Sequence, residues 1–409
     1  MTPKPKPTRG RSAKAQAAAD DAASQQMGLF FDMPTAVSSV PRAPVAAPAP
    51  VAAPMPEPMP TPMAEALAPA PAASPATEPL AVLPTAAAVA GAEAPSLEAL
   101  ARQLEASPDY RVLRRLQPTL QWPGTAPVAR EDIARVLVLD TETTGLDHNT
   151  ARIMELALLR VDVDRRTGQP VGMVQVYDGL EDPGQPIPPE VQKITGINSS
   201  MVAGQQLDEA LIATLLDDVD LVVAHNAGFD RPFVEARLPA FAEKDWACSF
   251  VDINWKKLGH GSSKLESLAL AHGWFYDAHR AETDCHALLA VLQADVPADA
   301  QLADAPPDVP AVPPNGLALL LAAASQLRYR LQATGAPFDA KDALRVRGYR
   351  WDAAAKVWHT RLGSAAELDA ECEWLKTNVY RRSAQVVVEA LDARVRYANR
   401  PGVISTRSL

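Results

Sequence analysis

Apolar and polar positions alternate along the middle of the chain in patterns that predict a mixed β-sheet. Residues 135–140 read RVLVLD and residues 221–224 read LVVA. Runs without polar alternation are typical of strands buried on both faces, as at the centre of an α/β sheet. Two β-rich runs, 153–163 and 171–177, are joined by RRTGQP, whose Gly and Pro favour a hairpin. Strands linked by short turns are antiparallel, so we expect a sheet of mixed direction.

Helical patterns fill the spaces between these predicted strands. Residues 207–216 have the spacing of an amphipathic helix, and residues 285–292 form an apolar one. Pro232 predicts that another helix begins close to it, because proline is tolerated in the first turn of a helix. Asp230 would then lie at a helix start. Residues 131–295 therefore read as one α/β domain.

The rest of the chain divides into four parts. Residues 1–95 hold half of the 38 prolines and are otherwise mostly Ala, so they cannot bury enough apolar surface to fold and we expect a disordered arm. Leucines at helical spacing predict a helical lead-in over 96–130. An acidic, proline-rich linker follows at 296–315, and residues 316–409 read as a small α+β module.

The C-terminal module differs in charge from the rest of the chain. Residues 327–409 contain 15 Lys/Arg and 9 Asp/Glu, whereas the formal net charge of the whole chain is −10. Aromatic residues alternate with basic ones at Tyr349, Trp351, Trp358, Arg347, Arg350 and Lys356. This pattern fits either a platform that stacks single-stranded nucleic acid or the core of a very small domain, and the sequence leaves both open.

One fragment of the Ala/Pro-rich arm, residues 26–31, contains large apolar side chains. It reads QMGLFF, in which Gln26, Leu29 and Phe30 could fill a pocket on a partner while the flanks stay mobile. The spacing resembles the peptide by which bacterial replication and repair proteins bind the sliding clamp. The alternative is a chance apolar patch.

Several classes of protein are disfavoured. No apolar run reaches the ~18 residues needed to span a bilayer, and the basic N-terminus lacks the hydrophobic stretch of a secretory signal. We therefore expect a cytoplasmic protein without a membrane contact. The three cysteines, Cys248, Cys285 and Cys372, are far apart and odd in number, which predicts neither a disulfide framework nor a zinc site.

Candidate chemistry begins at the end of the 135–140 strand. Asp140 and Glu142 are two positions apart, so both carboxylates point to the same side of an extended backbone. Like charges at the buried end of a strand need a neutralising partner, and a divalent metal ion would supply it. The alternative is that both residues start a loop, with a turn at Thr143, Thr144 and Gly145.

Three other polar residues also lie close to the ends of predicted strands or helices. Asp230 follows the 221–224 strand, and open α/β sheets place their ligand sites beyond the carboxyl ends of strands. His279 and Asp284 directly precede the apolar 285–292 helix. Taken singly, these residues could be a helix cap, a loop surface and a solvated charge.

Taken together, three segments resemble a known family. DTETTG at 140–145, HNAGFD at 225–230 and HRAETD at 279–284 are similar to the three exonuclease motifs of the DEDDh branch of the DnaQ-like 3′-to-5′ exonucleases. This is the family of the proofreading epsilon subunit of the bacterial replicase. The resemblance covers about residues 130–295 and implies a ribonuclease-H-like fold, with a mixed sheet flanked by helices.

The resemblance also implies roles for individual residues. The metal ligands would be Asp140, Glu142, Asp230 and Asp284, and His279 would be the general base. A histidine five positions before Asp284 places the chain in the DEDDh branch, where a tyrosine would mark the other one. Thr143, Thr144 and Asn226 fall where family members contact the 3′-terminal nucleotide.

The chemistry of phosphodiester hydrolysis fits these residue types. Two divalent ions ~3.5–4 Å apart can stabilise charge on both the attacking and the leaving oxygen. Carboxylates suit Mg²⁺, with Mn²⁺ able to substitute. Histidine, with an ordinary pKa near ~6.5, can accept the proton of the attacking water at neutral pH.

We therefore expect a metal-dependent 3′-to-5′ exonuclease that acts on single-stranded or frayed DNA ends in proofreading or repair. The clamp-like peptide suggests tethering to the sliding clamp, with a polymerase as a possible further partner, at the bacterial nucleoid. One alternative is an exonuclease that trims RNA, because fold does not settle substrate. The other is an inert adaptor that binds DNA ends or the clamp.

Overall fold

A computed structural model describes most of the chain after the N-terminal arm. The described residues are 96–122, 129–294, 315–380 and 382–409. The predicted disordered arm, its clamp-like peptide at 26–31 and nearly all of the predicted linker lie outside the described residues.

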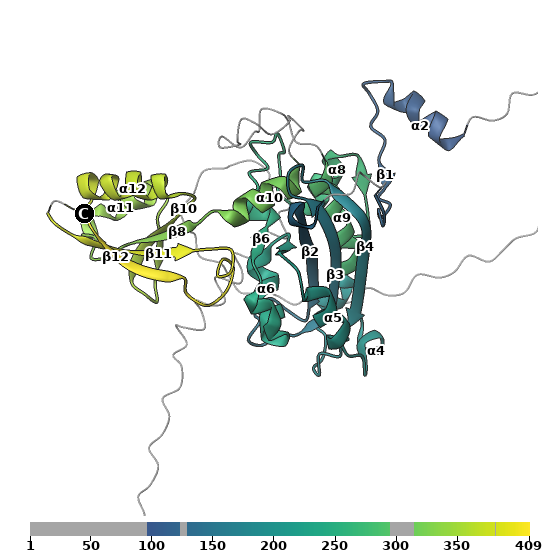
Figure 1. Ribbon diagram of the computed structural model, residues 1–409, viewed down its shortest axis with the longest axis horizontal. Helices are drawn as coiled ribbons and strands as arrows, with labels where there is room; N and C mark the ends of the chain where they lie inside the picture. Colours follow the sequence, from purple (N-terminus) through teal and green to yellow (C-terminus); the bar gives the residue numbers. More distant parts are fainter. Residues whose placement is uncertain (1–95, 123–128, 295–314, 381) are drawn as a thin grey trace, which may run out of the picture. The chain divides into compact units, whose positions relative to one another are not determined.

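The α/β domain contains a five-stranded mixed sheet in the order β4-β3-β2-β5-β6 (Figure 1). The strands are β2 (Ile133–Thr143), β3 (Ile153–Asp164), β4 (Pro170–Leu180), β5 (Leu221–Ala224) and β6 (Trp246–Cys248). β3 is antiparallel to both of its neighbours, β2 and β4, whereas β5 and β6 run parallel to β2. The predicted ribonuclease-H-like sheet of mixed direction is confirmed.

Helices cover both faces of this sheet. Val136 and Val138 of β2 belong to the apolar cluster that includes α8 (Leu265–Ala271) and α9 (Ala281–Gln293). The alternate residues Leu137 and Leu139 face the cluster with α5 (Glu209–Leu216) and α6 (Ala227–Arg237). Because side chains alternate along a strand, the positions of Asp140 and Glu142 continue the face that α9 covers.

Short elements complete the domain. They are η1 (Arg130–Asp132), α3 (Pro189–Thr195), α4 (Ser199–Val202), η2 (Pro239–Glu243), α7 (Ser249–Asp252) and β7 (Trp274–Phe275). Gly196 ends α3 in a left-handed conformation with φ 70°, which glycine adopts without steric cost.

The helix near Pro232 begins earlier than the sequence predicts. α6 starts at Ala227, so Pro232 lies inside the helix and Asp230 is its fourth residue rather than its start. A proline inside a helix removes the one hydrogen bond to the carbonyl four residues before it, here that of Gly228. Asp230 still lies in the first turn of the helix that follows β5, as predicted.

The predicted helical lead-in 96–130 is wrong over its second half. Within the described part of this stretch, 96–122 and 129–130, the one α-helix is α2 (Leu97–Glu105), and none of its residues is buried. Arg114–Arg115 form strand β1, which pairs in parallel with β7. The backbone N–H of Arg114 donates to the Gly273 carbonyl at 2.9 Å, so pairing with a distant strand overrides local helical spacing.

The C-terminal module is built on a second five-stranded sheet, in the order β12-β11-β8-β10-β9. Its elements are β8 (Arg328–Ala333), η4 (Phe338–Ala340), α11 (Lys341–Val346), β9 (Arg350–Asp352), β10 (Val357–Leu362), α12 (Ala365–Asn378), β11 (Gln385–Leu391) and β12 (Val403–Ser408). Tyr349 and Trp358 pack in its core, while Trp351 is 51% exposed. The core interpretation therefore holds for two of the three aromatic residues.

The helix α10 (Gly316–Ser325) packs on the α/β domain, although the sequence assigns it to the C-terminal module. Its residues Leu317 and Leu320 are buried in the same apolar cluster as α9. The side-chain amide of Asn315, the residue that caps α10, donates to the Gly168 carbonyl of the β3–β4 turn at 2.8 Å.

Two further sequence predictions concern membrane spans and the three cysteines. Among the described residues, none of the helices is both long and apolar enough to cross a bilayer. Cys248, Cys285 and Cys372 are all buried and free.

Candidate metal centre

Three of the predicted metal ligands converge where β2 meets α9. Asp140 and Glu142 lie on β2, and Asp284 lies in the first turn of α9. One carboxylate oxygen from each of these residues lies within 4.8 Å of the other two. All three keep part of their surface accessible, so an ion could enter from solvent.

Asp230 adds a fourth carboxylate from the other face of the sheet. It lies in the first turn of α6, is 3% exposed, and accepts a hydrogen bond from the Thr141 hydroxyl at 2.8 Å. Its charge is among the causes that raise the pKa of Asp140, so the two groups are close enough to repel each other. The structure thus brings the four predicted ligands together, with Asp230 outside the tightest group of three.

The electrostatics of this cluster favour a cation. Burial raises the pKa of Asp140 well above its usual range, and repulsion from the neighbouring carboxylates raises it further. The same two causes raise the pKa of Glu142 to about 8. Burial also raises the pKa of Asp230 to about 7 and that of Asp284 to about 6. Oxygen ligands that share uncompensated negative charge fit a hard divalent cation.

Asp284 is held in place by three donors that the motif pattern only partly reveals. The Tyr276 hydroxyl donates to its Oδ1 at 3.0 Å. The backbone N–H groups of His279 and Arg280 donate to its Oδ2 at 2.8 and 3.2 Å. His279 has φ 66°, an uncommon value for a residue with a side chain, and its imidazole is exposed. The charge of His279 lowers the pKa of Asp284, which places the imidazole beside the cluster.

An ion pair between a buried carboxylate and a partly exposed arginine lies next to the cluster, and the sequence did not reveal it. Glu155 on β3 is fully buried and stands opposite Glu142 in the β2–β3 register. Its carboxylate accepts from Nε and Nη2 of Arg280 at 2.9 and 2.5 Å, and from the backbone N–H of Ala281 at 3.0 Å. Glu155 therefore fixes the start of α9, and with it the His279 loop, against the sheet. The sequence signal that could have identified Glu155 is its position as an acidic residue inside the apolar run IMELALL.

The predicted substrate-binding residues occupy the loop after β2 and the start of α6. The Thr143 hydroxyl donates to the Gly145 carbonyl at 2.7 Å, and Thr144 accepts from the Gln185 amide at 2.6 Å. Both threonines are buried. Asn226 is half-buried at the N-terminus of α6 and does not cap that helix with its side chain.

His225, next to Asn226, is a second residue whose role the sequence did not reveal. Its Nδ1 lies 2.6 Å from the Ser249 hydroxyl and its Nε2 lies 2.9 Å from the Ser263 carbonyl. A carbonyl only accepts, so Nε2 donates to it and Nδ1 accepts from the serine. Burial lowers the pKa of His225 to about 4, so this neutral ring joins the end of β5 to the start of α7 and to the segment before α8.

Comparisons with known proteins agree with this geometry. A family model described as Exonuclease (RNase_T) matches residues 137–292. A DNA polymerase III subunit epsilon from Treponema pallidum (strain Nichols) is 32% identical over 154 residues, which cover 36% of this chain and 68% of that protein. A PolC-type DNA polymerase III from Thermotoga petrophila is 31% identical over 121 residues.

The extent of these matches differs between relatives. The PolC-type match covers 29% of this chain but only 8% of that protein. A solved structure described as exonuclease X in complex with 5′ overhanging duplex DNA is 27% identical, with a TM-score of 0.31, and covers 39% of this chain and 89% of that one. The family model ends at residue 292, before the C-terminal module begins.

The raised pKa values predict how the metal-free protein responds to pH. A carboxyl group whose pKa is raised by folding stabilises the folded state below its ordinary pKa, and this contribution is lost as pH rises through the raised value. With values of about 6, 7 and 8 for Asp284, Asp230 and Glu142, stability in EDTA should fall as pH rises from 5 to 8. Asp140→Asn, which removes one of the repelling charges, should raise the free energy of unfolding at pH 8 by roughly 1 kcal/mol.

Thermal and urea denaturation in EDTA at both pH values measure this effect. The matched control is Asp369→Asn, which removes an exposed charge on the C-terminal module and should change stability by less than ~0.5 kcal/mol. Equal effects of the two substitutions would show that repulsion within the cluster does not limit stability.

A second prediction concerns Tyr276. Tyr276→Phe removes only the hydroxyl that orients Asp284, and loss of a hydrogen bond to a metal ligand typically weakens metal binding about 10-fold or more. Titration with Mn²⁺ by isothermal calorimetry should show this loss. Tyr380→Phe is the matched control, because that hydroxyl donates to the Thr334 carbonyl within the C-terminal module. Unchanged Mn²⁺ affinity in Tyr276→Phe would remove Tyr276 from the site.

Proposed function

This chain belongs to the 3′-to-5′ exonuclease family of the DNA polymerase III epsilon subunit, and we propose that it hydrolyses DNA from the 3′ end. The match to the exonuclease family model and to the epsilon subunit confirms the family resemblance of the three motifs. The observation that carries the proposal is the convergence of four carboxylates beside one exposed imidazole, that of His279.

In this proposal Asp140, Glu142, Asp230 and Asp284 hold two Mg²⁺ ions, with Mn²⁺ able to substitute. The fit rests on their oxygen ligands and on pKa values that burial and mutual repulsion raise. Bound ions of this kind stabilise the charge that develops on the attacking and leaving oxygens of a phosphodiester. Thr141 and Tyr276 orient two of the four carboxylates.

His279 is the proposed general base. Its backbone N–H is held by Asp284, while its imidazole stays exposed and lies near the same carboxylate. An accessible imidazole at the edge of the cluster can take the proton of a water that attacks the phosphorus. Arg280, held by the buried Glu155, keeps the loop in this place.

The 3′-terminal nucleotide would lie against the loop after β2 and the start of α6. The Thr143 and Thr144 hydroxyls already form hydrogen bonds within the loop. These residues would therefore contact the nucleotide through their backbone groups and through the shape of the loop. Asn226 has a side-chain amide that does not cap α6, and this amide could bond the nucleotide.

DNA is the preferred substrate in this proposal because the relatives that match are named as parts of DNA polymerase III. Proofreading or repair at single-stranded or frayed ends, in the cytoplasm at the nucleoid, would follow from that substrate. Trimming of RNA and an inert adaptor role are the competing outcomes of the test below.

The test measures loss of nucleotides from 3′-terminal single-stranded DNA and RNA, with Mg²⁺ and with EDTA. Wild type should degrade DNA only with the metal, and Asp140→Ala should be inactive. His279→Ala should lower turnover about 10²–10⁴-fold, the usual contribution of a general base, while DNA affinity stays within twofold. Preference for RNA would reverse the substrate assignment, and no metal-dependent degradation would leave the adaptor.

We also propose that Gln26, Leu29 and Phe30 bind the sliding clamp. This rests on the sequence of residues 26–31, which lie outside the described residues. Replacing Leu29 and Phe30 by Ala should abolish clamp binding in surface plasmon resonance while hydrolysis of free oligonucleotides is unchanged. Met33→Ala, close by in the same arm, is the control. Clamp binding that survives the double replacement would rule out this peptide, and with it the proposed tether to a polymerase.

A further inference from the structure

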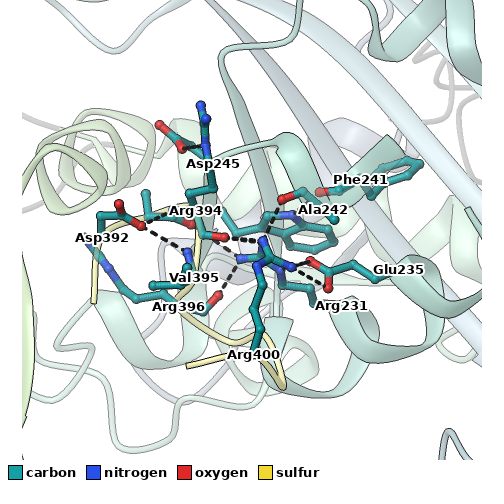
Figure 2. Close-up of polar contacts among 12 residues, drawn as sticks. Arg231, Glu235, Phe241, Ala242, Asp245, Asp392, Arg394, Val395, Arg396 and Arg400 are labelled. Atoms are coloured by element: carbon teal, nitrogen blue, oxygen red, sulfur yellow. Dashed lines mark hydrogen bonds and ion pairs between the residues drawn. The ribbon is translucent and has the colours of Figure 1, made fainter. Parts of the chain in front are cut away.

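The C-terminal module contacts the exonuclease domain through the loop between β11 and β12, residues 392–400, here called the docking loop. Figure 2 shows the docking loop beside α6, the helix that carries Asp230. Asp392 accepts the backbone N–H groups of Arg394 and Val395 at 3.0 and 3.1 Å. These bonds turn the loop so that its carbonyl groups meet α6.

Arg231 of α6 donates hydrogen bonds to these carbonyl groups. Its side chain is fully buried, and its guanidinium donates to the Arg396 carbonyl at 2.5 Å and to the Arg394 carbonyl at 2.6 Å. Its Nε donates to Glu235 at 2.5 Å, and its guanidinium lies 5.2 Å from the centre of the Trp246 ring. A buried guanidinium needs partners for its donors, and most of those partners here belong to the docking loop.

A second buried charge of the exonuclease domain is an anion, and it binds donors from the C-terminal module. Asp252 of α7 has a fully buried side chain. It accepts from the Tyr397 hydroxyl at 2.6 Å and pairs with Arg328 at 2.8 Å, and both of these partners come from beyond α10. One buried cation and one buried anion of the exonuclease domain therefore both take partners from the C-terminal module.

Further contacts extend this interface along the sheet edge and α6. The backbone N–H of Trp246 in the edge strand β6 donates to the Ala393 carbonyl at 2.9 Å. Arg400 pairs with both oxygens of Glu235 at 3.0 and 2.9 Å and donates to the Ala242 carbonyl at 2.6 Å (Figure 2). The docking loop thus accepts a backbone hydrogen bond from the edge strand of the sheet and holds α6 through Glu235 and Arg231.

We propose that Arg231 is a positioning residue, through which the docking loop holds Asp230 in the metal centre. Asp230 and Arg231 are consecutive in the chain, and each is fixed by a different element. Asp230 is bonded to Thr141 of β2, and Arg231 is bonded to the docking loop. If Arg231 loses its carbonyl partners, the first turns of α6 are no longer held on that side, and Asp230 shifts relative to Asp140. This inference rests on the proposed metal-dependent function, and its test below does not require activity.

The test compares Arg231→Met with wild type in the full chain. Methionine keeps an aliphatic side chain and removes every donor. The dissociation constant for Mn²⁺, measured by isothermal calorimetry, should rise about 10-fold, as for other residues that support a metal ligand. If the chain hydrolyses DNA, the Mg²⁺ concentration for half-maximal rate should rise equally, while KM for the oligonucleotide stays within twofold.

Arg394→Met is the matched control. Among the residues that the structure describes, the Arg394 side chain makes one exposed ion pair, with Asp245 across the same interface at 3.6 Å. Its carbonyl, which Arg231 uses, is kept in the variant. Mn²⁺ affinity within twofold of wild type is expected. An equal loss in both variants would show that the effect is not specific to Arg231 and would overturn the proposal.

The readouts separate positioning from loss of folding. A variant that merely contained more unfolded protein would bind fewer Mn²⁺ ions per chain with an unchanged dissociation constant, and that result would also overturn the proposal. If Arg231→Met does not fold, Arg400→Met replaces it, because Arg400 reaches the same helix through Glu235 from a partly exposed position. A smaller rise of the dissociation constant in the same direction is expected, and no rise would refute the inference. Wild type that binds Mn²⁺ without degrading DNA would refute the proposed function and leave this test intact.

Discussion

Repulsion among four carboxyl groups at the end of β2 is the constraint to which the rest of the exonuclease domain responds. Asp140 and Glu142 are brought together by strand geometry alone, and Asp230 and Asp284 arrive from helices on opposite faces of the sheet. Burial raises the pKa of each group. Such a cluster is costly without a cation, so the surrounding structure must hold the groups in place rather than let them separate.

The supporting residues supply that restraint in two layers. Thr141 and Tyr276 bond directly to carboxylates of the cluster, and backbone N–H groups complete the environment of Asp284. Behind them, the fully buried Glu155 pairs with the partly exposed Arg280 and ties the start of α9 to β3. A buried carboxylate without such a partner would be strongly unfavourable, so the pair favours one geometry. Here it fixes the loop that carries the exposed imidazole.

The sequence predicts the parts of this site that depend on local pattern. Asp140 and Glu142 follow from an apolar strand and the alternation of its side chains, and the three motifs indicate the other ligands. The buried partners are not predictable in this way, because Glu155 lies in an apolar run and meets Arg280 125 positions away. Arg231 resembles any arginine on a helix surface. Its carbonyl partners lie 163 and 165 positions further on, in the docking loop, where no local pattern indicates a contact with α6.

The separation between Arg231 and the docking loop has a consequence for synthesis on the ribosome. The edge strand β6 and the buried donors of Arg231 are made long before residues 392–400 emerge. An uncovered strand edge can pair with other chains, and contacts that are distant in sequence form slowly. The nascent exonuclease domain is therefore exposed to misassociation at this strand until residues 392–400 have been made and can bind β6 and Arg231.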